Sequence, residues 1–368
     1  MANMAQTVQD ERLKQEGLGA RLMKRPELGA IAGVILVTAF FLITADSAMF
    51  TLSGIMNFMT PAAQLGILAI GAAMLMIGGE FDLSIGSMVA FAGLIFGASV
   101  VTFGLPLIVA IPLTMAVAAG LGAMNGMIVL RTGLPSFIVT LAFLFVLRGA
   151  SLVGLKLASG GSTQLRGVRD AVQDDWLAPF FSGDAFGPIF VALAEIGLID
   201  TFKNGTPKVP GIPVEILWFI ALSLVATYVL LRTPQGNWVF ASGGDRNAAA
   251  NSGVPVRKVK ISLFMVTAIC AALVAIITVM DAGSTDARRG FMKEFEAIIA
   301  AVIGGCLLTG GYGSAIGAFF GAIIFGMVTI GLTYTDFDQD WFQIFLGGML
   351  LIAVLFNNYI RKRVTGER

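Results

Sequence analysis

Long apolar runs alternate with short polar breaks along most of the chain. The runs are 28–46, 61–79, 84–102, 106–130, 135–155, 213–231, 261–281, 296–310, 314–333 and 341–359. A helix needs roughly 20 apolar residues to cross the hydrocarbon core of a bilayer. The run at 296–310 is short for a crossing, and 187–199 is more typical of an interfacial helix. The pattern predicts an all-α, polytopic membrane protein with about ten transmembrane helices.

Composition supports this prediction and excludes several classes of protein. Apolar residues make up 57% of the chain and charged residues only 13%, about half the charged share of a soluble domain. The formal net charge of +1 gives no electrostatic footprint for nucleic acid. The chain has no histidine, which excludes His-based acid–base chemistry and His-ligated metals. Cys270 and Cys306 lie in apolar runs and are expected to be small buried side chains.

Basic residues mark the segments expected on the cytoplasmic side of the membrane. They gather in 1–27, in the loop 232–260 and in 360–368. Ten spans place all three on the same side, as the positive-inside rule requires. We therefore expect cytoplasmic N- and C-termini, with tails over 1–27 and 360–368 and a transmembrane domain over 28–359. The longest non-spanning segment, 156–212, is expected to be extracytoplasmic, with short helices.

Motifs for catalysis are missing from the sequence. It has no G-x-x-x-x-G-K-[ST] phosphate loop, no Cys/His metal cluster and no G-x-S-x-G elbow. We therefore expect no catalytic residues, no metal site and no ATP hydrolysis by this chain. Glu80 and Asp82 fall at a turn between two spans, and Arg148 is expected near the outer end of another. Ion-coupled pumps usually bury carboxylates at mid-membrane, so nearly charge-free span centres weigh against that class.

The first of three glycine motifs is GGEFDLSIGS at 78–87. Paired glycines permit a non-helical turn at membrane depth, and Asp82 or Ser84 is suited to cap the next helix. The motif is interpreted as a structural hinge or as part of a transport gate, and the two are compatible. The residues assigned to it are Gly78, Gly79, Asp82, Ser84, Gly86 and Ser87.

The second motif is GGDRNAAANSGVP, which begins at Gly243 in the loop 232–260. Asp245 is a suitable N-cap, the alanines favour helix, and Gly253 suits a helix end. A short polar helix between two spans would provide a docking site for a soluble partner, or it is an ordinary interhelical loop. The candidate docking residues are Gly244, Asp245, Arg246, Asn247, Ala248, Ala249, Ser252 and Gly253.

The third motif, AAVIGG followed by GGYGS, begins at Ala300. Like the first motif, it places a glycine break between an apolar helix and a helix of small residues. It is interpreted as a distant repeat of the first motif or as generic packing of small residues. The candidate hinge residues are Gly304, Gly305, Gly310, Gly311 and Gly313.

Together the motifs resemble the inner-membrane permease family of ribose-type (simple-sugar) ATP-binding-cassette importers. GGEFDLSIGS is similar to that family's Gly-Gly-Ile-Asp-Leu-Ser-Val-Gly-Ser signature, although Glu80-Phe81 adds one residue before Asp82. Arg246 stands where the family pattern leads us to expect an acidic residue. The resemblance covers about residues 50–155 and 213–359 and also includes the blocks Asn125–Gly149, Ala241–Val254 and Ala300–Gly313.

The resemblance implies a transmembrane permease subunit in the bacterial inner (plasma) membrane, in contact with lipid. It implies a second permease copy (homo- or heterodimer), an ATPase subunit that binds the ATP, and a periplasmic sugar-binding protein that delivers a sugar or polyol. The chain itself would then need no cofactor. Uncharged polar residues in or beside spans are candidates for the translocation path or for helix-to-helix hydrogen bonds: Asn57, Gln64, Asn125 and Thr140. Two alternatives stay open, a branched-chain amino-acid-type permease and an ion-coupled secondary carrier.

Overall fold

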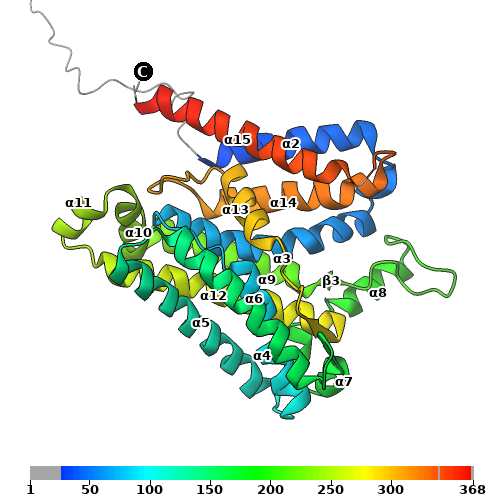
Figure 1. Ribbon diagram of the computed structural model, residues 1–368. Helices are drawn as coiled ribbons and strands as arrows, with labels where there is room; N and C mark the ends of the chain where they lie inside the picture. Colours follow the sequence, from blue (N-terminus) through cyan, green and yellow to red (C-terminus); the bar gives the residue numbers. More distant parts are fainter. Residues whose placement is uncertain (1–25, 339, 366–368) are drawn as a thin grey trace, which may run out of the picture.

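The chain folds into a bundle of long helices (Figure 1). The computed structural model describes residues 26–338 and 340–365, with side chains followed to Leu355 except at 26 and 353. Most of the expected N-terminal tail (1–25) and the end of the C-terminal tail (366–368) lie outside the described residues. The principal helices are α2 (Pro26–Thr44), α3 (Leu52–Ile77), α4 (Ile85–Gly97), α5 (Leu107–Thr132), α6 (Ser136–Ala158), α9 (Val214–Arg232), α12 (Val256–Ala282), α13 (Lys293–Ile303), α14 (Ala315–Gly331) and α15 (Trp341–Thr365).

Eight helices of the described chain are long and apolar enough to cross a membrane, so the expected count of ten is not confirmed. They are α2, α3, α4 with its π-helical extension η3 (Ala98–Thr102), α5, α6, α9, α12 and α14 with its 3₁₀ extension η5 (Leu332–Tyr334). The run at 296–310 forms α13, whose 11 residues span only about 16 Å at 1.5 Å per residue. Helix α15 has 25 residues, and Trp341–Ile352 is its apolar stretch among the residues whose side chains are described.

Helix α13 follows a non-helical approach and ends at Ile303, inside the predicted run. Residues 284–286 form strand β4 (Ser284–Asp286), which pairs antiparallel with β1 (Gln164–Arg166), and turns lead from β4 to Lys293. From Gly304 the predicted run 296–310 continues as turns, so only its first part is helical.

Helices α3 and α12 form the centre of the bundle. In their most apolar stretches 83% and 78% of the residues are buried, against 28% in α5 and in α6. Helix α14 packs along α3, and α5 packs along α12. The outer helices expose large apolar side chains such as Leu36, Ile43 and Phe145, as expected of surfaces that face lipid.

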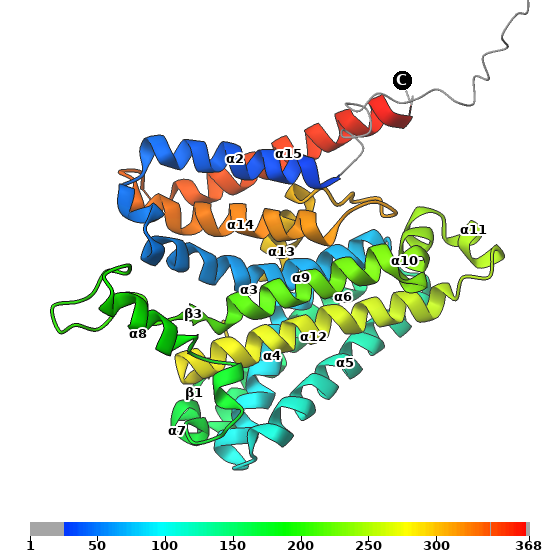
Figure 2. The same cartoon turned by 180° about the vertical axis from the view of Figure 1, so that it is seen from behind.

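Two polar regions lie at opposite ends of the bundle (Figures 1 and 2). Helices α10 (Pro234–Gly244) and α11 (Arg246–Asn251) connect α9 to α12 and project from one end. At the other end, the segment 156–212 contains several short elements. They are β1, α7 (Val168–Val172), η4 (Ala178–Phe180), β2 (Asp184–Ala185) and α8 (Gly187–Glu195), with β2 paired to β3 (Ile212–Pro213).

Gly122 in α5 tests the packing of the bundle. A Cβ there would lie 2.9 Å from the Cβ of Ala268 in α12, whereas one on Gly120 would meet nothing within 4 Å. We expect Gly122→Leu to reduce stability by about 1–3 kcal/mol through overpacking. Gly120→Leu, on the same helix, should unfold at or slightly above the wild-type temperature, because Leu favours helix more than Gly does and meets no neighbour there. Thermal unfolding of the purified protein in detergent measures both, and equal midpoints would contradict the α5–α12 contact.

Candidate functional site

The break between α3 and α4 is a tight backbone reversal. Gly79 has a left-handed φ of +77°, a conformation that favours glycine. The amide of Glu80 then donates to the carbonyl oxygen of Leu75 at 3.2 Å and closes the end of α3. Ser84 occupies the N-cap position of α4, but its side chain makes no capping bond. Asp82 instead accepts from the amide (2.8 Å) and hydroxyl (2.5 Å) of Ser84 and thereby orders the entry into α4.

Two hydroxyls of α6 satisfy backbone amides of this break. The amide of Phe81 donates to Ser136 Oγ at 3.0 Å, and the amide of Leu83 donates to Thr140 Oγ1 at 3.0 Å. An amide without a helical partner inside a membrane otherwise costs several kcal/mol. Thr140 is fully buried, and its hydroxyl oxygen serves as the hydrogen-bond acceptor for this break.

Two further helices hold the side chains of the break. Asn125 of α5 donates through Nδ2 to Ser84 Oγ at 3.0 Å, and Thr267 of α12 donates to Asp82 Oδ2 at 2.9 Å. Asn125, Ser84 and Thr267 are fully buried. The first motif is therefore fixed by α5, α6 and α12 together.

An ion pair crosses the same region. Lys260, the fifth residue of α12, places Nζ 2.6 Å from Glu80 Oε1, and both side chains are nearly fully buried. Sequence reasoning assigned Lys260 to the basic loop and Glu80 to a turn. The inserted residue before Asp82 was the available signal for Glu80, but its partner lies 180 positions away.

The second motif forms the predicted polar helix. Asp245 caps α11, because its Oδ1 accepts from the amides of Asn247 (2.9 Å) and Ala248 (3.0 Å). Gly253 follows the helix with a left-handed φ of +86°. All six residues of α11 are exposed except Ala249, which is buried. Helix α11 thus presents a polar surface at one end of the molecule (Figure 2).

The three motifs meet at one point, which we call the glycine junction: Gly79, Gly243, Gly310 and Gly311. The amide of Gly311 donates to the carbonyl of Ile77 at 2.8 Å, which joins the third motif to the end of α3. A Cβ on Gly310 would lie 2.7 Å from both Gly79 Cα and the Gly243 carbonyl oxygen. Backbone therefore touches backbone where the α3–α4 break and the third motif meet the end of α10.

The remaining hinge glycines allow helices to approach closely. Gly304, after α13, packs against Gly317 of α14, and a Cβ on it would overlap the backbone there. Gly305 and Gly313 have φ values of +92° and +154°. Gly86 in α4 faces Glu294 and the carbonyl of Gly290. Ser87 is buried, and its hydroxyl donates to Ser84 O at 2.8 Å.

The four predicted path residues do not gather in one place. Asn125 and Thr140 lie beside the first motif, as described above. Asn57 is exposed and donates to the Tyr334 hydroxyl at 3.0 Å. Gln64 is half-buried and bonds the side chain of Glu215, the second residue of α9.

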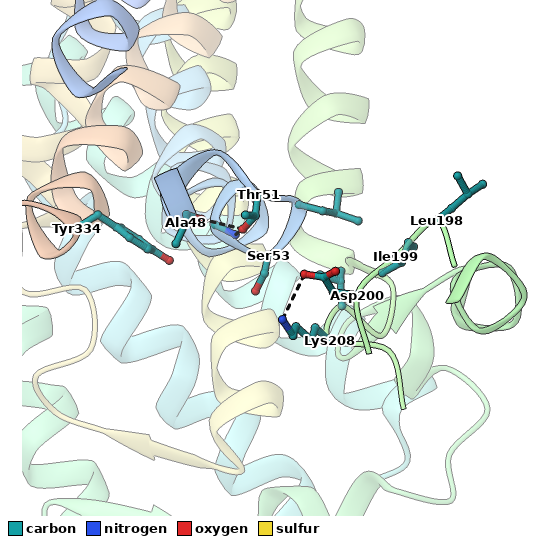
Figure 3. Close-up of a pocket in the computed structure, with 11 residues that line it drawn as sticks. Ala48, Thr51, Ser53, Leu198, Ile199, Asp200, Lys208 and Tyr334 are labelled. Atoms are coloured by element: carbon teal, nitrogen blue, oxygen red, sulfur yellow. Dashed lines mark hydrogen bonds and ion pairs between the residues drawn. The ribbon is translucent and has the colours of Figure 1, made fainter. Parts of the chain in front are cut away.

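A pocket of about 390 Å³ lies beside the segment that follows α8, at the end of the bundle opposite α11 (Figures 2 and 3). Its walls are the start of α3, the segment after α8, and Tyr334 on the other side. Within it Lys208 Nζ lies 3.2 Å from Asp200 Oδ2. At the same end of the molecule, burial raises the pKa of Asp184. The pocket lies outside the network of the three motifs.

Comparisons with known proteins add to this geometry. A family model described as "branched-chain amino acid transport system / permease component" matches residues 54–354. The chain is 31% identical over 330 residues to the ribose import permease protein RbsC of Haemophilus influenzae, covering 90% of this chain and 92% of the relative. It is 29% identical over 370 residues to the xylose transport system permease protein XylH of Escherichia coli K12, with the same coverage. No solved structure matches the chain significantly.

The buried ion pair generates a prediction. Lys260→Met leaves the Glu80 carboxylate buried without its partner, which should cost about 3–5 kcal/mol of stability. The double variant Glu80→Leu/Lys260→Met should recover most of that loss, because neither charge then remains buried. Thermal unfolding in detergent measures the cycle. Lys208→Met, which removes the largely exposed pair with Asp200, should cost below about 1 kcal/mol. A double variant no more stable than Lys260→Met would refute the interpretation.

Proposed function

The chain belongs to the family of branched-chain amino acid transport system / permease components, and from this membership we propose that it carries a sugar or polyol as the transmembrane subunit of an ATP-binding-cassette importer. It is a permease and not an enzyme, and ATP is hydrolysed by a separate subunit. The observation that supports this mechanism is the glycine junction. It connects α10, and through α10 the helix α11, to the α3–α4 break and to the third motif.

Sugar is the favoured cargo because ribose and xylose permeases are among the relatives that match over about nine-tenths of this chain. The family description names branched-chain amino acids instead, so that cargo is the second candidate. A zwitterion would call for charged or dipolar partners along its path, whereas a sugar needs only weak polar contacts. An ion-coupled carrier is disfavoured by membership in this family.

Helix α11 is the proposed docking site for the ATPase. It is polar and exposed, and Asp245 stabilises it as a separate short helix. Displacement of α10 by the ATPase would push Gly243 against Gly79 and Gly310, since no side chains separate these backbones. Closure of the ATPase on ATP would then favour one of two packed arrangements of the helices. In this scheme Asn125 and Thr140 support the first break while it moves.

Docking of the ATPase on α11 would set the orientation of the chain in the membrane and the positions of its other partners. Helices α10 and α11 would lie in the cytoplasm of the bacterial cell, with both chain termini on that side. A periplasmic binding protein would deliver the sugar to the opposite end, where residues 159–213 and the pocket beside Tyr334 lie. A second permease copy, identical or related, would complete the translocation path within the inner membrane.

Reconstitution tests the proposed function. Proteoliposomes containing this chain, its ATPase and its binding protein should accumulate labelled ribose or xylose only when ATP is supplied to the ATPase. Uptake of labelled leucine in place of the sugars would support the amino-acid alternative. Uptake driven by a sodium or proton gradient without ATP would overturn the importer assignment.

The docking assignment predicts the effect of a charge on α11. Ala250→Glu places a carboxylate on the exposed surface of α11 and should reduce ATP-driven uptake by about tenfold or more, because a buried unpaired charge costs about 2–5 kcal/mol at an interface. Ala192→Glu makes the same change on exposed α8 at the opposite end and should leave ATPase binding intact. Co-purification of the ATPase and uptake rates measure both variants, and unchanged binding and uptake in Ala250→Glu would exclude α11.

A further inference from the structure

Arg148 lies at the centre of a membrane-length helix. It is the thirteenth of the 23 residues of α6, whereas the sequence suggested a place near the outer end of the span. It is half-exposed. An arginine at mid-membrane that faces lipid is costly, so such residues face protein or a water-filled cavity. The surroundings of Arg148 therefore indicate which face of the bundle lines water or contacts another protein rather than lipid.

The guanidinium of Arg148 holds the non-helical approach to α13. Nη1 donates to the carbonyl of Arg289 at 3.2 Å and to that of Ala287 at 3.5 Å. Its carbon Cζ lies 5.6 Å from the ring centroid of Phe291. Among the described residues, the hydrogen bonds of this guanidinium come only from Nη1, so Nε–H and Nη2–H can still donate to a solute.

The residues that follow present apolar side chains beside this arginine. The side chain of Phe291 is 64% exposed, and Met292 and Phe295 are also exposed. Met292 has a left-handed φ of +65°, a strained conformation for a non-glycine residue that is typical of functional sites. Helix α6 and α13 lie on the face of the bundle seen in Figure 1.

A buried carboxylate balances the charge. Glu294 is only 3% exposed, and its Oε2 has no hydrogen-bond partner among the described residues. It interacts electrostatically with Arg148 and faces Gly86 of the first motif. Arg148 and Glu294 carry opposite charges, so the pair adds no net charge to this surface.

We propose that this face, formed by Arg148, Phe291, Met292 and Phe295, is a sugar-contacting surface of the translocation path, with a second permease copy as the opposite wall. The inference rests on the proposed function. The ring of Phe291 would support the apolar face of a sugar, and Arg148 would donate hydrogen bonds to its hydroxyls. Mostly apolar surfaces with a few oriented polar groups are typical of small-molecule sites. Glu294 would act as a positioning residue, because it touches Gly86 of the gate motif as well as interacting with Arg148.

Cysteine accessibility tests the proposal in the assembled importer. Phe291→Cys and Val146→Cys form a matched pair, since their native side chains are 64% and 62% exposed. Val146 lies on α6 two residues before Arg148, about 200° around the helix at 3.6 residues per turn, and is expected to face lipid. The native Cys270 and Cys306 are buried, which keeps the background low.

A charged methanethiosulfonate should label Phe291→Cys at least about tenfold faster than Val146→Cys in proteoliposomes during ATP turnover, because only a hydrated thiol forms the reactive thiolate. Labelling should also block sugar uptake in Phe291→Cys and leave it unchanged in Val146→Cys. Equal labelling rates, or labelling of Phe291→Cys without loss of uptake, would overturn the proposal.

Substitutions at Phe291 separate path contacts from folding. Phe291→Ala should reduce the sugar uptake rate by about tenfold, consistent with loss of one aromatic contact worth about 1.4 kcal/mol, while protein yield stays at the wild-type level. Phe291→Tyr, which keeps the ring, should restore uptake. Wild-type uptake in Phe291→Ala would contradict the contact. If the wild-type importer takes up no sugar at all, the proposed function fails, whereas failure of the Phe291 variants alone concerns only this surface.

Discussion

Backbone amides and carbonyls that leave helical geometry inside a membrane must find partners within the protein, because lipid provides none. Residues 78–84 and 283–292 interrupt the helices of this bundle. The first break donates amide hydrogen bonds to the hydroxyl oxygens of Ser136 and Thr140 of α6, and carbonyls of the second break accept hydrogen bonds from Arg148 of the same helix. Helix α6 is therefore the common support of both breaks. Its burial is low, yet it carries the hydroxyls and the guanidinium that permit irregular backbone beside α4.

The glycine junction differs from the support by α6, because it contains no side chain that could rotate to absorb a displacement. Its contacts join backbone to backbone. Packed atoms compress little, so movement of α10 must shift the end of α3 or the residues around Gly310. The hydrogen bond from Gly311 to Ile77 joins those two segments. The buried Glu80–Lys260 pair adds a second connection, since Lys260 lies a few residues after α11 at the start of α12.

Local patterns gave correct predictions where the physics is local. The Asp245 cap, the helix that follows it and the glycine turn at Gly79 each depend on residues within a few positions, and a single sequence displays them. The apolar runs likewise identified the long helices. The run at 296–310 is short for a crossing by its length alone, and in the structure its helix ends at Ile303 and turns follow. The predictions for two basic residues failed for another reason. Lys260 and Arg148 were interpreted from their neighbours along the chain, whereas their partners lie more than 130 positions away. Such pairings follow from tertiary packing, which periodicity does not encode.

The positions of the buried charged side chains bear on what could drive transport. Glu80 with Lys260 and Arg148 with Glu294 bring together opposite charges beside α4, so the interior remains close to neutral. A carrier driven by protons needs a carboxylate that exchanges its proton with water on each side. Glu80 is instead bound to an ammonium at 2.6 Å, and Glu294 is nearly fully buried against Gly86. Both carboxylates are thus placed to hold the breaks in position. The proposed docking helix α11 is exposed and connects through α10 to the glycine junction, so a displacement there would reach Gly79 and Gly310.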